Sequence, residues 1–199
     1  LRSRGLGDVY KRQGWTSDDT DAAERVKIQY GTSMCYPVSS MGSHVSVVPN
    51  HQLNRKTPLH TRANVAYFGT FGYELDLNEL SDEEISEVKQ QITFMKEYRE
   101  LIQFGTFYRL KSPFEGNETA WMTVSEDKKT ALVFWYRERN VVNADFTRVR
   151  LQGLDPDLIY RNEYNETENY GDELMNLGLL TTDCTAGEPT SEDLSLIHI

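Results

Sequence analysis

The hydrophobic pattern of the chain changes its period once, near residue 105. Before that point, the period is helical, and six apolar residues recur at intervals of three and four: Ile85, Val88, Ile92, Met95, Tyr98 and Ile102. After it, apolar residues come in short runs separated by turn residues, as in antiparallel sheets. The change predicts two units of different fold class, residues 14–105 and residues 106–193.

The beginning of the first unit is predicted to alternate strands and helices. We expect a strand that ends at Trp15, a helix that begins within residues 17–21 and ends at Gly31, and a buried strand over residues 43–49. Residues 50–62 are polar and are predicted to form a long loop, which is a candidate binding loop.

The rest of the first unit continues the alternation. Residues 63–77 are predicted to form strand and turn, and the long helix after Leu80 is expected to begin with a capping box of Ser81 and Glu84. Strands alternating with helices indicate a parallel sheet. We therefore expect the C-terminal portion of a (β/α)8 barrel.

The second unit is predicted to be all-β. Turn residues separate six short apolar runs, at residues 107–110, 120–124, 131–136, 147–151, 158–164 and 177–180. This spacing is typical of an antiparallel β-sandwich domain. The acidic stretch at residues 165–172 is interpreted as a solvated hairpin loop.

Both ends of the chain differ from the rest. Residues 1–13, LRSRGLGDVYKRQ, are basic and without periodicity, and no start methionine precedes the motifs that follow. Residues 194–199, LSLIHI, have a similar character. We interpret the two segments as a non-native leader and a non-native tail, and we expect them to lie outside the fold.

Charge and cysteine content restrict the partners. The formal net charge of −10 disfavours nucleic acids and anionic membranes, and no apolar run reaches the ~18 residues of a membrane span. Cys35 and Cys184 are too few for a disulfide framework and lack metal-ligand spacing. We predict a cytoplasmic protein that needs no metal and no cofactor.

The segment WTSDDTD, residues 15–21, is the strongest candidate for chemistry, because it follows a predicted strand of a barrel. Asp19 and Asp21 are interpreted as caps of the next helix. Asp18 lies nearest the strand end, and Trp15 is expected to form an apolar wall that disfavours its charged form. Trp15 is also a candidate for stacking on a sugar, with core packing as the alternative. A Mg or Ca site is a further alternative for the carboxylates, although their spacing matches no known loop pattern.

Two histidines, His44 and His51, are weaker candidates. A buried or loop histidine is the simpler interpretation of each, and a contact with a sugar is the alternative. Neither is predicted to be catalytic.

Four long motifs resemble the family 36 α-galactosidases, the melibiases: WTSDDTDAAERVKIQYGTSMCYP, SSMGSHVSVVPNHQ, RANVAYFGTFGYELDLNELS and MNLGLLTTDCTAGEP. The resemblance covers nearly all of residues 14–189. It implies that Asp18 is the general acid/base at the end of the sixth barrel strand and contacts the substrate. It also implies a homotetramer.

The family's retaining mechanism uses two carboxylates about 5–5.5 Å apart. One attacks the anomeric carbon, and Asp18 would protonate the departing oxygen and later take a proton from water. The motif with the nucleophile should lie upstream of Gly14. We therefore expect this chain to be a fragment of a longer protein, called the parent enzyme below, and to be inactive and poorly stable alone.

The expected activity is hydrolysis of terminal α-galactosides such as melibiose and raffinose. A galactosyl-transferring relative is one alternative, because the residues do not distinguish water from a sugar acceptor. The other is a non-catalytic sugar-binding or assembly module formed by residues 105–189.

Overall fold

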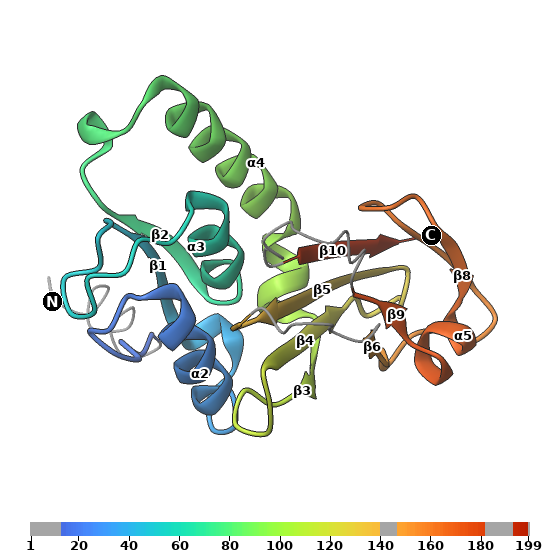
Figure 1. The fold of residues 1–199 in the computed structure, drawn as a ribbon. Coiled ribbons are helices and arrows are strands. Elements are labelled where there is room, and N and C mark those ends of the chain that lie inside the picture. The colour runs from blue at the N-terminus through green and yellow to red at the C-terminus, as the bar shows by residue number, and fades with distance from the viewer. Residues whose placement is uncertain (1–12, 140–146, 182–192, 199) are drawn as a thin grey trace, which may run out of the picture. The chain divides into compact units, whose positions relative to one another are not determined.

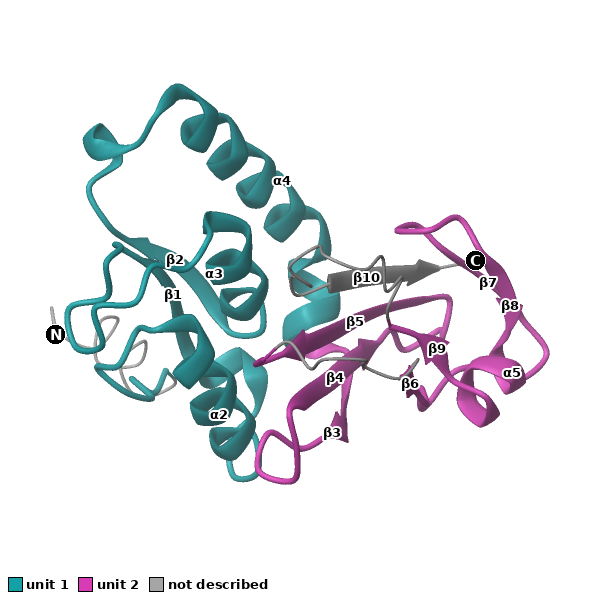
Figure 2. Ribbon diagram, viewed as in Figure 1, with its two compact units in different colours: residues 1–103 teal, residues 104–199 magenta. Residues whose placement is uncertain are grey.

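The computed structural model describes residues 13–139 and 147–181, together with the backbone of residues 193–198. Most of the predicted leader and Cys184 lie outside these residues. The chain divides into two compact units between Gln103 and Phe104 (Figure 2). Among the described residues, no helix is long and apolar enough to cross a lipid bilayer.

The first unit is built on parallel strands. Strand β1 (Gly42–Ser46) pairs in parallel with β2 (Thr70–Glu74), and Gly14 forms a parallel bridge with Met41. The strands alternate along the chain with three helices (Figure 1), α2 (Ala22–Thr32), α3 (Leu59–Ala66) and α4 (Asp82–Phe104). Short 3-10 turns lie at Val38–Ser40 and Leu77–Glu79. This alternation is that of a (β/α)8 barrel, as predicted.

The helices are attached to the strands by apolar packing and by buried polar side chains, among them Gln29. Gln29 of α2 donates hydrogen bonds to the carbonyl oxygens of Val65 (2.9 Å) and Phe68 (3.2 Å). Its own side-chain oxygen accepts from the hydroxyl of Ser43 on β1 (2.9 Å). Because Gln29 is buried, these bonds satisfy groups that water does not reach, and they fix α2 against β1 and α3.

Helix α2 begins and ends later than predicted. Its N-cap is Asp21, and its first helical residue is Ala22. Gly31 lies within the helix and is not a left-handed terminator. The last turn closes when the backbone N–H of Ser33 bonds to the carbonyl of Gln29 (2.9 Å), with Ser33 itself in the right-handed region. A left-handed residue is therefore not needed there.

Helix α3 was not predicted, and its residues were divided between the expected loop 50–62 and the expected strand 63–77. Pro58 stands at the N-cap, where its missing N–H costs no hydrogen bond. Leu59, Ala63 and Ala66 then fall on one buried face at helical spacing. The helix has only eight residues, too few to give a clear periodic signal.

Helix α4 agrees with its prediction in detail. The backbone N–H of Ser81 donates to the Glu84 carboxylate (2.9 Å), and the backbone N–H of Glu84 donates to the Ser81 hydroxyl (3.2 Å). These reciprocal bonds are the predicted capping box.

The second unit consists of antiparallel sheets, as predicted. A six-stranded sheet has the order β3-β4-β5-β10-β7-β8, and β6 pairs with β9. The elements are β3 (Thr106–Lys111), β4 (Glu118–Val124), β5 (Thr130–Arg137), β6 (Arg148–Val149), β7 (Ile159–Asn162), β8 (Glu168–Tyr170), α5 (Gly171–Asn176), β9 (Leu179–Leu180) and β10 (Asp193–His198). The expected fold class, part of a barrel followed by an antiparallel sandwich, is confirmed.

The core of the second unit lies between β4 and β5 on one side and the β6–β9 pair with α5 on the other. It is formed by Ala120, Met122, Val124, Ala131, Val133, Trp135, Val149, Leu151, Leu154, Tyr160, Leu174 and Leu179. Alternate residues of β4 enter this core, and the residues between them are buried on the opposite face of the sheet.

Two parts of the second unit depart from the sequence analysis. The acidic stretch 165–172 is not only a loop, because β8 and the start of α5 lie within it. Strand β8 is stabilised by backbone pairing with β7, which acidic side chains do not prevent. The predicted tail coincides with β10 over residues 194–198, whose backbone pairs with β5 and β7. Its non-native origin stays a prediction.

Candidate active site

Three loops of the first unit follow the carboxyl ends of parallel strands. Residues 15–21 follow the Gly14 bridge, residues 47–58 follow β1, and residues 75–81 follow β2. In barrel enzymes the catalytic groups lie at this edge, because side chains from neighbouring strand ends converge there. The predicted residues Trp15 and Asp18 lie at this edge.

Two of the three clustered aspartates accept backbone hydrogen bonds, and Asp21 is the N-cap of α2 as interpreted from the sequence, whereas Asp19 acts in the turn before it. Asp21 accepts from the backbone N–H groups of Ala23 (3.1 Å) and Glu24 (3.2 Å) through Oδ1. Asp19 accepts from the backbone N–H of Asp21 (3.0 Å). Both carboxylates thus organise the start of α2.

Asp18 has a different environment. Its side chain is exposed, and its Oδ1 accepts a hydrogen bond from the indole Nε1 of Trp15 (2.8 Å). The expected apolar wall is wrong, because Trp15 presents its polar N–H to the carboxyl group. Trp15 is not packed in the core formed by the described residues, since 56% of the residue is exposed there. The catalytic role of Asp18 and the substrate contact of Trp15 stay predictions.

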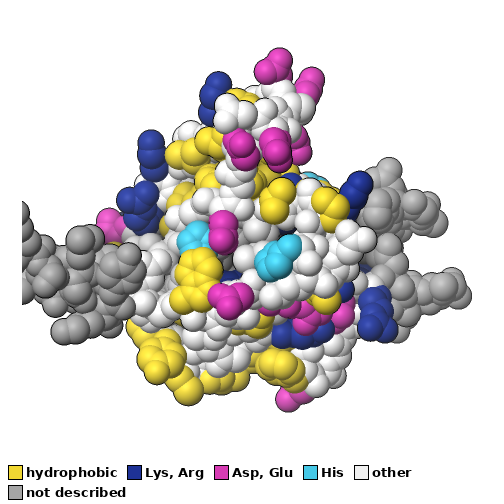
Figure 3. All heavy atoms as spheres, turned by 90° about the vertical axis from the view of Figure 1, so that its left-hand side faces the viewer, with side chains coloured by type: hydrophobic (Ala, Val, Ile, Leu, Met, Phe, Trp, Pro, Cys, Tyr) yellow, Lys and Arg dark blue, Asp and Glu magenta, His cyan; other side chains and the backbone are white. Residues whose placement is uncertain are grey.

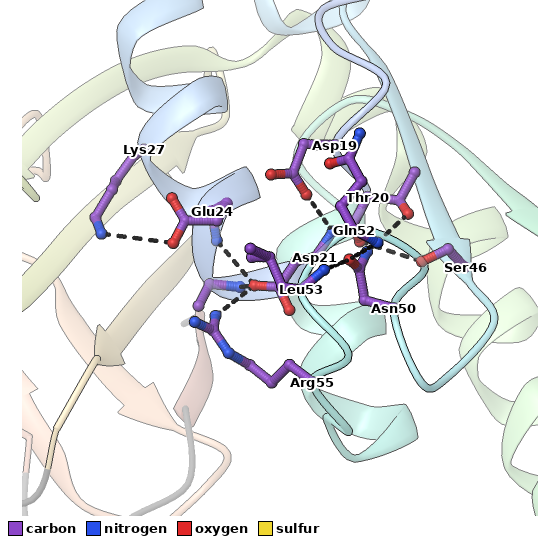
Figure 4. A network of polar contacts seen from close by, with 11 residues as sticks. Asp19, Thr20, Asp21, Glu24, Lys27, Ser46, Asn50, Gln52, Leu53 and Arg55 are labelled. Atoms are coloured by element: carbon purple, nitrogen blue, oxygen red, sulfur yellow. Dashed lines mark hydrogen bonds and ion pairs between the residues drawn. The ribbon is translucent and has the colours of Figure 1, made fainter.

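The loop after β1 supports the segment that carries Asp18 (Figure 4). Asn50 accepts from the backbone N–H groups of Gln52 and Leu53 (2.9 Å each) and donates to the Thr20 hydroxyl (3.3 Å). Ser46 donates to the Thr20 carbonyl (3.1 Å). Part of the predicted binding loop therefore has a scaffold role.

An ion pair strengthens the same connection. Arg55 Nη1 lies 2.5 Å from Oδ1 of Asp21, whose side chain is only 1% exposed (Figure 4). A buried carboxylate is stable only with charge partners or hydrogen-bond donors, and Asp21 has both. Arg55 belongs to the predicted binding loop, but its pairing with Asp21, 34 residues away, was not predicted.

A buried arginine holds the candidate segment against the strand. Arg25 of α2 donates to the carbonyl of Gly42 on β1 and to the carbonyl of Ser17 (3.3 Å). Burial lowers the pKa of Arg25, although the charges of Asp19 and Glu74 oppose this. The sequence analysis missed Arg25 as well, because a single arginine in a helix gives no signal of burial.

His44 and Trp15 lie together. Their ring centroids are 4.9 Å apart, with the planes tilted by 33°. Burial lowers the pKa of His44; Glu74 opposes the shift and Arg25 adds to it. His51 is exposed on the loop after β1. Figure 3 shows histidine, acidic and hydrophobic side chains gathered on one face.

Metal binding has no support in the described part of the chain, where no group of three or more His, Cys, Asp and Glu side chains could hold an ion. The polar groups at the strand ends can instead offer a carboxyl group for proton transfer and an aromatic surface for a sugar.

Replacing Asp21 tests the scaffold. Asp21→Ala removes two N-cap bonds and the partner of Arg55, so we expect the free energy of opening of α2 to fall by about 2 kcal/mol. Asp21→Asn keeps a capping oxygen and should lose less. Hydrogen–deuterium exchange at Ala23 and Glu24 measures both. Equal exchange in the alanine variant and the unchanged protein would contradict the assignment.

Two family models match the chain. The Melibiase model matches residues 5–105, and the model of the glycosyl hydrolase family 36 C-terminal domain matches residues 118–195. The two matches correspond to the two units of the structure.

Characterised relatives agree. α-Galactosidase AgaA of Geobacillus stearothermophilus is 54% identical over 170 residues, which are 85% of this chain and 23% of the relative. α-Galactosidase Mel36A of Lactobacillus acidophilus is 50% identical over 169 residues, with the same coverage. The chain thus spans about a quarter of the length of these relatives.

Crystal structures of AgaA variants from Geobacillus stearothermophilus share the fold. One variant with an Asp→Asn substitution is in complex with raffinose (TM-score 0.87, 47% identity), and one with an Asp→Ala substitution at a different position is in complex with stachyose (TM-score 0.87, 48% identity). Both also carry an Ala→Glu substitution, and each alignment covers 94% of this chain and 26% of the other. By its sequence and its structure, this chain belongs to the melibiase family, the α-galactosidases of glycoside hydrolase family 36.

Proposed function

We propose that this chain supplies Asp18 as the general acid/base of a retaining α-galactosidase, acting within the parent enzyme on terminal α-galactosides such as melibiose and raffinose. The observation that carries the proposal is the division of labour among the three aspartates. Asp21 caps the start of α2 and Asp19 accepts the backbone N–H of Asp21 in the turn before the helix, whereas Asp18 is exposed at the end of a barrel strand. Asp18 is therefore the carboxyl group available to a substrate.

The proposed reaction has two steps. In the first, Asp18 gives its proton to the glycosidic oxygen while a nucleophilic carboxylate of the parent enzyme bonds to the anomeric carbon and the carbon–oxygen bond breaks. In the second, Asp18 takes a proton from water, whose oxygen bonds to the anomeric carbon and releases the nucleophile. Two displacements at one carbon give galactose in its original α configuration.

The AgaA complexes support a mechanism with two essential carboxylates. Raffinose is bound in a variant that has lost one aspartate, and stachyose in a variant that has lost another. An enzyme in which one carboxylate attacks and a second transfers protons would leave its substrate intact when either is missing. From the family resemblance we also propose a homotetrameric, cytoplasmic parent enzyme, and a chain that is inactive by itself.

Azide tests the proposal in the parent enzyme. With Asp18→Ala and an activated aryl α-galactoside, the galactosyl–enzyme ester should form but hydrolyse slowly, because water lacks a base. Azide needs no base and should attack the anomeric carbon from the face that the carboxylate vacated. We expect faster turnover and α-galactosyl azide as the product, identified by nuclear magnetic resonance.

Two other outcomes would decide against this role. Turnover that azide does not change means that Asp18 is not the base. A β-galactosyl azide would place Asp18 on the other face of the sugar, as the nucleophile. Asp19→Ala is the matched control, because it removes a neighbouring carboxylate that caps the backbone, and azide should not affect it.

A further inference from the structure

We propose that Trp15 and His44 form a positioning pair for Asp18, in which the indole N–H selects the carboxyl oxygen that carries the proton and the imidazole ring holds the indole in place. This inference rests on the proposed role of Asp18. It goes further by assigning functions to two side chains that the two-step reaction does not itself require.

The first part of the inference is the hydrogen bond from Trp15. Its Nε1–H donates to Oδ1 of Asp18 at 2.8 Å, and an indole nitrogen donates only. An oxygen that faces an N–H donor accepts and does not carry the proton in that direction. In the protonated carboxyl group, Oδ1 is therefore the carbonyl oxygen, and Oδ2 is the oxygen that gives up the proton.

The ring of Trp15 is held by its neighbour His44. Within this chain 56% of the residue is exposed, so burial by the described residues alone does not fix the ring. Among the described residues, the aromatic ring that lies against Trp15 is the imidazole of His44, with 4.9 Å between the ring centroids. A Cβ added at Gly42 would lie 3.8 Å from Trp15 Cε3 and 3.7 Å from His44 Cε1, so both rings rest over this glycine.

His44 is fixed from its other side by β2. A Cβ at Gly72 would lie 3.0 Å from His44 Cδ2, which is closer than ordinary van der Waals contact, so the absence of a side chain there leaves room for the imidazole. Gly72 and His44 are register partners in the parallel pair of β1 and β2. The two strands thus set the position of the ring on which Trp15 packs.

The charge state of His44 suits this role. Burial lowers its pKa, and the neighbouring Arg25 acts in the same direction against Glu74, so the ring is neutral near pH 7. A cationic ring beside the acid would favour loss of the proton that the first step needs. A neutral ring supports Trp15 without this effect.

The effect of the leaving group on kcat/KM distinguishes a Trp15 that orients Asp18 from a Trp15 that only stacks on galactose. If Trp15 only stacked on galactose, its loss would weaken binding of all galactosides alike. If it orients the acid, its loss affects substrates whose departing group needs a proton and spares those whose group leaves as a stable anion.

The first experiment is Trp15→Phe in the parent enzyme, which keeps an aromatic ring and removes the N–H. We expect kcat/KM for raffinose to fall by about tenfold, the range of a hydrogen bond to an ionisable group. The value for 2,4-dinitrophenyl α-galactoside should change by less than about twofold, because that group leaves without protonation. Equal losses on both substrates, or no loss on either, would overturn the proposal.

Trp135→Phe is the matched control. It makes the same change in the second unit, at an indole nitrogen that is buried with no hydrogen-bond partner among the described residues. Any effect there should be the same for both substrates. If Asp18→Ala discriminates between the substrates and Trp15→Phe does not, only the positioning role fails.

The second experiment concerns the histidine ring. His44→Ala should reduce kcat/KM for raffinose by about threefold with the same leaving-group dependence, and His44→Phe, which keeps a ring, should restore most of it. The double variant Trp15→Phe with His44→Ala should be no slower than Trp15→Phe alone, because His44 acts through Trp15. Equal rates for the alanine and phenylalanine variants, or additive losses, would overturn the role of His44.

Discussion

Replacing Asp18 by alanine in the parent enzyme is expected to lower kcat/KM for raffinose by about 10²- to 10⁴-fold, the usual contribution of a general acid. The sugar that departs from raffinose is a poor leaving group, so its oxygen needs a proton as the bond breaks. An aryl galactoside with an acidic phenol does not, and its kcat/KM should fall far less. Loss of the general acid should therefore make kcat/KM depend steeply on the acidity of the leaving group.

A series of aryl α-galactosides with phenols of graded acidity measures this dependence. Asp18→Asn is the isosteric test, because an amide accepts the Trp15 hydrogen bond at its oxygen but transfers no proton at this step. It should behave like the alanine variant. Asp19→Ala loses the hydrogen bond from the backbone N–H of Asp21. Its kcat/KM should depend on the acidity of the phenol as it does in the unchanged enzyme. Unchanged raffinose hydrolysis in Asp18→Ala would mean that another acid does the work.

The parts of the fold that could be predicted are those with strong local signals. The capping box of Ser81 and Glu84 and the period of the following helix specify α4 before any tertiary contact is considered. Short, mainly apolar runs between turn residues likewise specify β4 and β5. Helix α3 was not predicted, because its eight residues are too few to show a clear helical period. Such a short segment is easily interpreted as strand or loop.

Strand β8 shows a second limit. Its residues, Glu168–Tyr170, have an acidic and exposed pattern that indicates a loop. Its structure follows from backbone hydrogen bonds to β7, and these depend on where the neighbouring strand lies. Local sequence carries no such information.

The candidate site divides in the same way. Asp18 could be named as a candidate from its place between a strand and a helix, and the N-cap Asp21 from its residue type. The supports come from a distance: Arg55 lies 34 residues from Asp21, and Arg25 reaches the carbonyl of Gly42, 17 residues away. Only the folded arrangement of α2 and β1 brings these groups together.

The second unit contains a charge network that should dominate its local stability. Glu118 accepts hydrogen bonds from Lys111 (2.5 Å), Arg137 (2.8 Å) and Thr147 (2.9 Å), and the Arg137 guanidinium also lies over the ring of Trp135 (5.0 Å to the centroid). The side chains of Glu118 and Arg137 are 14% and 4% exposed. Removing the carboxylate charge would leave a buried guanidinium without its counter-ion.

Glu118→Gln is therefore expected to lower the free energy of opening of β4 and β5 by about 2–3 kcal/mol, below the full value for a buried pair because Lys111 is partly exposed. Hydrogen–deuterium exchange of the two strands in the parent enzyme measures it. The matched control is Glu166→Gln, since the Glu166–Arg161 pair is exposed (78% and 52%) and should contribute at most about 0.5 kcal/mol. Equal effects of the two substitutions would mean that burial does not strengthen the network.

The pH dependence gives the same network a second test. Burial alone would raise the pKa of Glu118, but the hydrogen bonds from Lys111, Arg137 and Thr147 and the charge of Lys111 outweigh it, so the pKa lies below its ordinary value of 4.5. Because the folded-state pKa is the lower one, the charged carboxylate stabilises the unit above pH 4.5, and this stabilisation is lost as the pH falls through the lowered pKa. The free energy of opening of β4 and β5 should then differ less between Glu118→Gln and the unchanged protein below pH 4.5. The exchange rates must first be corrected for the pH dependence of intrinsic amide exchange. A difference that stayed constant into acid would assign the loss to side-chain packing and not to the charge.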